Sequence, residues 1–212
     1  MEGRTLFSKF LNLSPEKQDR ILNAALKEFA QKGYQNASTN EIVKEAGISK
    51  GLLFHYFNNK KDLYLYLYDY FIEMLMEESY SNIDWEQRDI FIRYKQIAIL
   101  KFTLFQKYPN AFEFIKKVYP EDASEVKPEL EERKKGFLNK GYKELFGDVD
   151  LTKFKAGIDI EKAVNIIYWT IEGFAYKLQD RYASIPVDQI KLDEITAEMD
   201  VYSEMLKQSF YQ

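Results

Sequence analysis

Apolar residues recur every three or four positions along most of the chain, which is the spacing of one face of an α-helix. Glycine and proline residues interrupt these stretches at positions typical of helix ends. The pattern predicts an all-α protein with about nine helices and no strand. The predicted helices span about residues 15–33, 39–46, 50–56, 60 to at least 75 (capped by Asn59), 86–107, 109–118, 126–146, 159–182 and 188–210.

Two short helices joined by a tight turn are predicted within residues 38–57. Ser38 is a suitable N-cap, and Glu41, three residues later, would complete a capping box. Gly47 would end the first helix in the left-handed conformation that glycine adopts easily. Ser49 would then cap the second helix. A helix pair of this size is the unit that places one helix in the major groove of DNA.

The second of these helices is unusual for a core element, because polar residues surround a small apolar anchor. It carries Lys50, Gly51, His55 and Tyr56. Hydrogen-bonding side chains, a cation and a glycine that permits close backbone approach all suit contact with a duplex. This stretch therefore predicts DNA binding.

The order of residue types between Ile21 and Leu63 also resembles the DNA-binding domain of the TetR family of bacterial transcriptional regulators. The matching residues are Ile21-Leu22-Asn23-Ala24-Ala25, Phe29, Gly33-Tyr34, Thr39, Ile42, Ala46-Gly47-Ile48-Ser49-Lys50-Gly51, His55-Tyr56-Phe57, Lys60 and Leu63. The rest of the chain is similar only in length and helical character. The resemblance implies a three-helix helix-turn-helix domain over residues 1–60, with an N-terminal arm at 1–13. It also implies a larger helical domain for ligand binding and dimerisation over residues 61–212.

Eight residues are the candidates for DNA contacts, assigned from this resemblance and from side-chain chemistry: Thr39, Ser49, Lys50, Gly51, Phe54, His55, Tyr56 and Lys60. Thr39 suits a phosphate contact through its hydroxyl and the helix-end amides. Ser49 either serves only as a cap or also contacts a phosphate. Lys50 suits a phosphate or a guanine edge, and the alternative is a solvated lysine. Gly51 would let the helix backbone approach the groove floor.

Base readout is assigned to Phe54 and His55. Family members often carry Tyr where this chain has Phe54, so that residue would either contact a thymine methyl group or face inward. A lone histidine is more often structural, but its place in the motif favours a role for His55 at DNA. Tyr56 and Lys60 are predicted phosphate contacts, with Lys60 at the positive end of its helix.

The charge distribution agrees with this division. Residues 1–60 hold nine Lys and Arg against six Asp and Glu, or +3, whereas residues 61–212 hold 21 against 28, or −7, which together give −4. A modestly basic domain on an acidic one suits a regulator that binds DNA through one end. In the arm, Arg4 and Lys9 alternate with apolar residues, which either pack onto the domain or let the arm reach the minor groove.

The inventory of reactive residues argues against an enzyme. The only histidine is His55, in the predicted recognition helix, so neither a histidine triad nor a multi-histidine metal site can be built. No glycine-rich phosphate-binding motif is present, and zero cysteines exclude disulfides and thiolate chemistry. We predict no enzymatic activity, metal or cofactor. Without a long apolar run or a secretory signal, we also expect no membrane span and a cytoplasmic location.

The second domain is rich in aromatic residues, with 25 of the 32 Phe and Tyr residues and both tryptophans. In residues 166–176 the only charge is Glu172, and a buried carboxylate needs a partner. That partner could be a cationic ligand, a lysine or arginine of this chain, or water at a dimer seam. The candidate ligand contacts are Phe105, Trp169, Glu172 and Tyr176. They predict an apolar or aromatic effector, which could also carry a positive charge.

The last two long helices, about 159–182 and 188–210, carry apolar residues at helical spacing. An intrachain core would explain this pattern, but the resemblance implies that these helices pair with their copies in a four-helix homodimer. Gly173 would allow close helix approach there. Such a dimer presents two recognition helices about 34 Å apart to a palindromic operator.

The sequence therefore predicts a ligand-responsive transcriptional regulator, with repression as the expected effect. Two alternatives remain. One is a helical protein-interaction module that does not bind DNA, and the other is a small-molecule carrier or enzyme.

Overall fold

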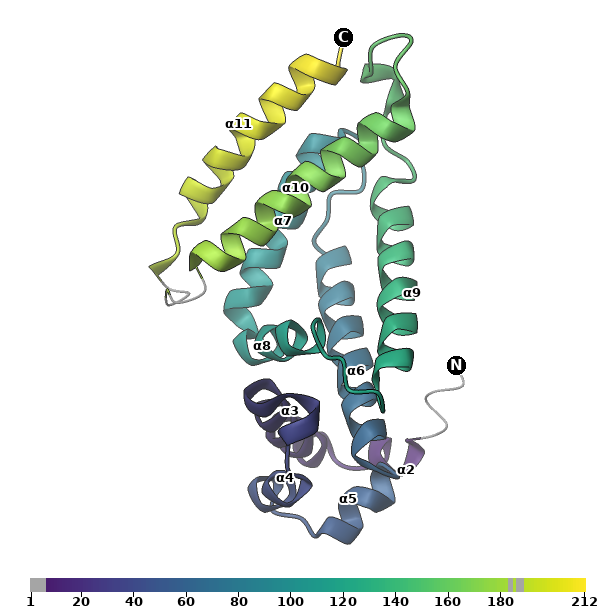
Figure 1. The fold of residues 1–212 in the computed structure, drawn as a ribbon, viewed down its shortest axis with the longest axis vertical. Helices are drawn as coiled ribbons and strands as arrows, with labels where there is room; N and C mark the ends of the chain where they lie inside the picture. Colours follow the sequence, from purple (N-terminus) through teal and green to yellow (C-terminus); the bar gives the residue numbers. More distant parts are fainter. Residues whose placement is uncertain (1–6, 183–184, 186–188) are drawn as a thin grey trace. The chain divides into compact units, whose positions relative to one another are not determined.

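The computed structural model describes residues 7–182, 185 and 189–212, and within them the chain forms ten α-helices, one 3-10 turn and no strand. The predicted all-α fold is confirmed. The elements, drawn in Figure 1, are α2 (Ser8–Leu11), α3 (Pro15–Asn36), α4 (Thr39–Ala46), α5 (Lys50–Tyr56), α6 (Lys60–Tyr80), α7 (Ile90–Lys107), α8 (Pro109–Val118), α9 (Lys127–Phe146), η1 (Leu151–Lys153), α10 (Ile160–Tyr182) and α11 (Leu192–Phe210). Every predicted helix is present, and α2 within the arm is additional. No described helix combines the length and the apolar character needed to cross a membrane.

The helices form two compact units, each built from two separate segments of the chain. Unit 1 contains Met1–Glu77 and Tyr108–Asn139, whereas unit 2 contains Glu78–Lys107 and Lys140–Gln212. The predicted division into residues 1–60 and 61–212 is a functional one and stays a prediction. The compact units extend further and alternate along the chain.

In unit 1, α3 lies between α8 on one side and α4 on the other (Figure 1). Aromatic rings fill the space between α3, α6 and α8. The centroid of Tyr64 lies 4.9 Å from that of Phe29 and 5.3 Å from that of Phe114, and all three side chains are fully buried. Because Ala111, Phe114 and Val118 of α8 belong to this core, the helix-turn-helix segment alone does not complete it.

Two glycines set the ends of the helices around the motif. Gly33 interrupts α3 with φ 69° and ψ −178°, a conformation open essentially to glycine alone. Gly47 follows α4 in the left-handed conformation, with φ 65° and ψ 38°. Both positions agree with the helix ends expected from the sequence.

The predicted capping box at Ser38 is wrong, because the Ser38 side chain makes no cap hydrogen bond. The backbone N–H of Ser38 instead donates to Oε1 of Glu28, at 2.8 Å. The competing carboxylate belongs to the preceding helix, and Glu28 is only 8% exposed.

The arm packs onto unit 1 through α2. Phe10 is fully buried, and its ring centroid lies 4.8 Å from Phe57 and 5.5 Å from Tyr66. These contacts agree with the packing interpretation of the apolar residues in the arm. Arg4 lies outside the described residues.

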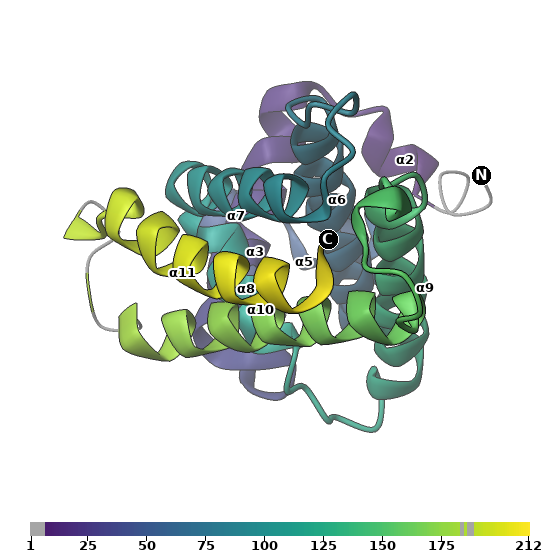
Figure 2. The same cartoon turned by 90° about the horizontal axis from the view of Figure 1, so that it is seen from above.

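In unit 2, α11 packs against both α7 and α10, and the three helices lie side by side in Figure 2. The core between them is mainly aliphatic, with Ile167 fully buried and Met199 1% exposed. Phe91 at the start of α7 is also buried and packs edge-on against Tyr211, with centroids 5.3 Å apart.

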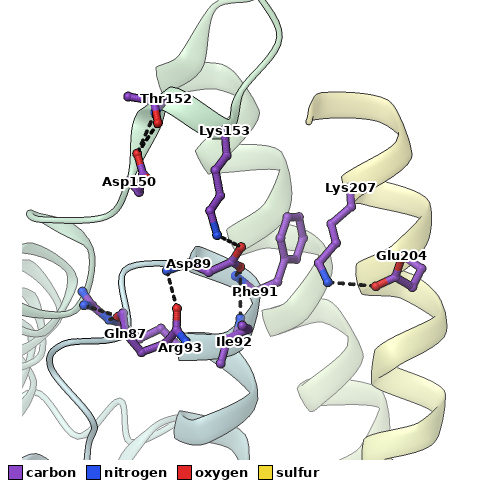
Figure 3. Close-up of polar contacts among 10 residues, drawn as sticks. All are labelled: Gln87, Asp89, Phe91, Ile92, Arg93, Asp150, Thr152, Lys153, Glu204 and Lys207. Carbon is purple, nitrogen blue, oxygen red and sulfur yellow. Dashed lines mark hydrogen bonds and ion pairs between the residues drawn. The ribbon is translucent and has the colours of Figure 1, made fainter. Parts of the chain in front are cut away.

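One end of unit 2 is held by a cluster of charges that we call the clasp: Asp89, Arg93, Asp148 and Lys153. Arg93 is fully buried, pairs with Asp148 and donates from Nε to the carbonyl of Gln87 at 3.0 Å. Figure 3 shows Asp89 at the start of α7, where Oδ1 accepts the N–H of Phe91 at 2.9 Å while Oδ2 accepts from Lys153 at 2.7 Å. This cap explains why α7 begins at Ile90 rather than near residue 86.

Candidate nucleic-acid interface

The helix-turn-helix is formed by α4, the turn at Gly47 and α5. Ile42 and Ala46 of α4 and Leu53 of α5 are fully buried, so the apolar side of each helix faces the core of unit 1. The N–H of Ile48 donates to the carbonyl of Val43 at 3.0 Å and closes the turn. The motif predicted from the sequence is therefore present in the structure.

The first turn of α5 presents polar groups outward. Oγ of Ser49 accepts the N–H of Leu52 at 3.2 Å, which confirms the predicted cap. Ser49, Lys50, Gly51 and His55 are all exposed. Four of the eight candidate residues therefore share an accessible surface on this one short helix.

Leu52 is a residue of this surface that we did not single out from the sequence, and it is 43% exposed. Its neighbour Leu53 takes the inward position. Since consecutive residues of a helix point about 100° apart, only one leucine of the pair can point into the core. The Leu52-Leu53 pair in the sequence could therefore have indicated that one of the two leucines is exposed. An exposed apolar side chain beside Lys50 suits contact with a thymine methyl group.

Phe54 and Tyr56 are half-buried at the edge of the α5 surface. Nζ of Lys50 lies 5.9 Å from the centroid of the Phe54 ring, within cation–π range. The Tyr56 ring lies 5.9 Å from His55 and 6.3 Å from Phe10, centroid to centroid. Part of each ring therefore remains accessible, and the contact of Phe54 with a base stays a prediction.

The remaining two candidates lie at helix N-termini. Thr39, the first residue of α4, is half-buried. Lys60, the first residue of α6, donates from Nζ to the carbonyls of Gln35 and Ala37, both at 3.2 Å, and lies 4.6 Å from the Tyr34 ring centroid. A lysine has three N–H donors, so one is left for the predicted phosphate contact.

In unit 2 the candidate ligand contacts do not form a buried set. Trp169 and Tyr176 are each 65% exposed, and Phe105 is half-buried. The premise of a buried carboxylate is wrong, because the Glu172 side chain is 42% exposed within one chain. Its partner is a lysine of this chain, Lys101, with Nζ 3.5 Å from Oε1.

The fold and the surface of α5 together define a helix-turn-helix protein. The family profile described as "Bacterial regulatory proteins, tetR family" matches residues 21–67, which span α4, α5 and the start of α6. The HTH-type transcriptional regulator YuxN of Bacillus subtilis is 47% identical over 58 residues, but the match covers only 27% of this chain and 20% of YuxN. The similarity to the tetR family of bacterial regulatory proteins is therefore established for residues 21–67, the helix-turn-helix part of the chain.

Three further similarities extend into the second unit. The fatty acid metabolism regulator protein of Bacillus subtilis is 25% identical over 160 residues, which cover 74% of this chain and 80% of that protein. A TetR family regulator from Chloroflexus aurantiacus has the same fold, with a TM-score of 0.60, 21% identity and coverage of 97% of this chain and 98% of that one. The regulator FadR from Bacillus subtilis, solved with stearoyl-CoA, has a TM-score of 0.55, 20% identity and coverage of 86% and 95%.

Proposed function

We propose that the protein is a transcriptional regulator, most simply a repressor, that binds a palindromic operator as a homodimer and responds to a small-molecule effector. The observation that carries this proposal is the exposed set Ser49, Lys50, Gly51 and His55 on the recognition helix of a TetR family motif. Lys50, Thr39 and Tyr56 supply phosphate contacts, while Leu52, Phe54 and His55 face base edges.

The homodimer is proposed to form through α10 and α11. Four large apolar side chains on these two helices are more than half exposed: Trp169, Tyr176, Val201 and Met205. A Cβ added at Gly173 would meet no heavy atom within 4 Å, so this part of α10 is open in the single chain. An apolar patch of this kind marks an interaction surface, and a two-fold dimer would cover both copies at once.

The proposed effector is apolar. The predicted second domain, residues 61–212, contains 25 of the 32 Phe and Tyr residues of the chain, and a similar regulator was solved with stearoyl-CoA. Since Lys101 already faces Glu172, the argument for a positively charged effector loses its main support. The effector would release DNA only to the extent that it binds the released state more tightly than the DNA-bound state.

No enzymatic step, metal or cofactor is part of this proposal. The protein would act in the cytoplasm, where the DNA is. The rival function of a helical interaction module makes a different prediction, since its helix-turn-helix would serve only for packing and would bind no duplex.

The test is selection of bound fragments from source-genome DNA by the purified protein at moderate salt. The Lys50→Ala/Tyr56→Ala variant removes two proposed contacts, and Lys117→Ala/Tyr119→Ala is the matched control, because it removes the same two residue types from an exposed region away from α5. Enrichment of one palindrome by the wild type and the control alone supports the proposal. Equal enrichment by all three proteins, or none by any, contradicts it.

The effector is tested on the enriched fragment with stearoyl-CoA as the probe. Dissociation of the complex at concentrations that also raise the thermal stability of the free protein supports an apolar, acyl-bearing effector. A response only to small polar anions contradicts it.

A further inference from the structure

The turn between α3 and α4 decides where the helix-turn-helix begins. Gly33 kinks α3 three residues before its end at Asn36, and α4 starts six residues after Gly33 at Thr39. Several backbone groups of this turn have no partner in a helix. They are bound instead by charged side chains that come from three other places in unit 1.

The most distant of these side chains is Glu121, in the connection between α8 and α9. Oε2 of Glu121 accepts the N–H of Tyr34 at 3.0 Å, across 87 positions of the sequence. Oε1 accepts the N–H of Ala123 at 3.1 Å within the same connection. One carboxylate therefore joins the two segments that make up unit 1.

Two more charged side chains bind the same turn, and each has the charge that suits the backbone group it contacts. Glu28 of α3 accepts the N–H of Ser38, while Lys60 of α6 donates to the carbonyls of Gln35 and Ala37. Carboxylates thus take the N–H groups and the ammonium takes the carbonyls. Hydrogen bonds to ionised groups are roughly twice as strong as neutral ones, so these contacts fix the path of the turn.

Apolar packing holds the rest of this region without Glu121. The Tyr34 ring is 2% exposed and lies 5.1 Å from Tyr64, centroid to centroid. Phe114 and Val118 of α8 are fully buried in the same core. Removing one hydrogen bond acceptor from Glu121 therefore frees the Tyr34 N–H while the core of unit 1 remains packed.

We infer that Glu121 is a positioning residue for DNA binding: by holding the Gly33–Tyr34 backbone, it sets the position of α4 and, through α4, of α5. This inference rests on the proposed function. Without the Glu121 contact, α4 and α5 would be in the binding-competent arrangement for only a fraction of the time. The apparent dissociation constant for DNA equals the intrinsic one divided by that fraction, so it rises.

The experiment compares three variants of the full chain. Glu121→Gln removes the charge and leaves a single carbonyl oxygen to accept. Glu121→Asp keeps the charge but shortens the reach toward Tyr34. Asp122→Asn is the matched control, since it removes the same charge from the next residue, which is exposed.

The first readout needs no DNA and is amide hydrogen exchange of the free protein. We expect exchange at Tyr34 and in the first turn of α4 to become about tenfold faster in Glu121→Gln and Glu121→Asp, because a lost hydrogen bond of about 1.4 kcal/mol corresponds to a factor of ten. Asp122→Asn should match the wild type. Unchanged exchange at α4 in the Glu121 variants overturns the inference, whatever the protein does with DNA.

The second readout is binding to the palindrome that the wild type enriches, beside a duplex of equal length and scrambled sequence. Both Glu121 variants should bind the palindrome about tenfold more weakly than Asp122→Asn does, with equal binding of the scrambled duplex. If Glu121→Asp binds the palindrome as tightly as the wild type, the negative charge matters for DNA binding and the hydrogen bond to Tyr34 does not. That result would overturn the inference. A wild type that binds no fragment defeats the proposed function instead, and the exchange readout then decides on Glu121 alone.

Discussion

The largest fully buried side chains of unit 1 are aromatic or aliphatic, among them Phe29, Tyr64 and Phe114, whereas the largest of unit 2 is the charged side chain of Arg93. The two units also differ in what they leave uncovered. Val201 and Met205 on α11, like Trp169 and Tyr176 on α10, are more than half exposed, and among the large apolar side chains described in unit 1 only Tyr119 reaches that level.

This difference indicates two ways of stabilising a small helical body. An apolar core depends on shape and area, and it loses stability gradually when one contact is removed. A buried charge depends on particular partners, and loss of one partner leaves the others unsatisfied in a region without water. Unit 2 should therefore be the more sensitive to single substitutions and to acid, and it should gain more from a partner molecule.

The largest effect is expected for Arg93→Met, which leaves Asp148 and the carbonyls of Trp85 and Gln87 without their donor. Each carbonyl left without a donor costs about 1–3 kcal/mol, whereas Asp148, whose side chain is 54% exposed, can be solvated. Both tryptophans of the chain lie in unit 2, so tryptophan fluorescence during urea unfolding measures this loss directly. The control is Lys95→Met, which breaks the more exposed pair with Asp200. If both variants lose the same free energy of unfolding, the buried Arg93 of the clasp contributes no more to stability than the exposed Lys95.

The next effect concerns the uncovered face of unit 2. Trp169→Glu should raise the dimer dissociation constant by about thirtyfold or more, since buried tryptophans at interfaces contribute roughly 2 kcal/mol or above. Sedimentation velocity over a range of concentrations measures the change. Tyr119→Glu, an exposed aromatic residue of unit 1, should leave the dimer intact. If Tyr119→Glu also dissociates it, or if Trp169→Glu does not, α10 is not at the interface.

Protonation of one carboxyl in each unit should change the stability of the two units in opposite directions. The hydrogen bond from Arg93 holds the pKa of Asp148 below its ordinary 3.8, so its stabilisation is present above that value and is lost as the pH falls through the lowered pKa. Burial raises the pKa of Asp69 in unit 1, only partly offset by Arg133, so protonation of Asp69 favours the folded state as the pH falls through its raised pKa.

Urea unfolding between neutral and acid pH tests this difference. Asp148→Asn should flatten the loss of unit 2 stability below about pH 4, and Asp69→Asn should steepen the loss for unit 1. Each effect should stay below about 1 kcal/mol, because the Asp148 side chain is half exposed and Asp69 has Arg133 beside it. The same direction of change in both variants would contradict the assignment of the two carboxyls.

The smallest effect separates two proposed DNA contacts of unit 1. Lys60→Ala should weaken binding to all DNA sequences. It should also make the slope of log K against log salt concentration less steep by about one for each helix-turn-helix that binds. It should also lower the stability of unit 1, because Lys60 binds the carbonyls of Gln35 and Ala37. His55→Ala should instead change which sequences are preferred. Equal, sequence-independent losses from both variants would refute this division of roles.

Much of this fold is predictable from local patterns. Helical spacing gives the helices, and the caps at Ser49 and Asn59 form as expected, with the Asp62 N–H donating to Asn59 at 2.8 Å. The four-residue helix α2 is too short to produce a periodic signal. The error at Ser38 has a physical cause as well, since a carboxylate ten residues earlier, Glu28, competes for the same N–H.

Contacts between distant segments leave no such trace. Nothing in the spacing of residues 108–139 indicates that α8 packs on α3, or that Glu121 binds the backbone at Tyr34. The partner of Glu172 was one of three alternatives, and only the fold selects Lys101. For the same reason the eight candidate DNA contacts could be chosen from the family resemblance and from side-chain chemistry, but the binding of Lys60 to the carbonyls of Gln35 and Ala37 could not be predicted.

The interleaved make-up of unit 1 also bears on how such proteins exchange parts during evolution. Unit 1 is made of Met1–Glu77 and Tyr108–Asn139, so it cannot be transferred to another protein as one contiguous segment. A recombinant that inherits a new N-terminal segment keeps an old α8, whose Ala111, Phe114 and Val118 must fit a foreign core. Changes of operator preference in this lineage should therefore accumulate by point substitution on α5 more readily than by swapping of heads.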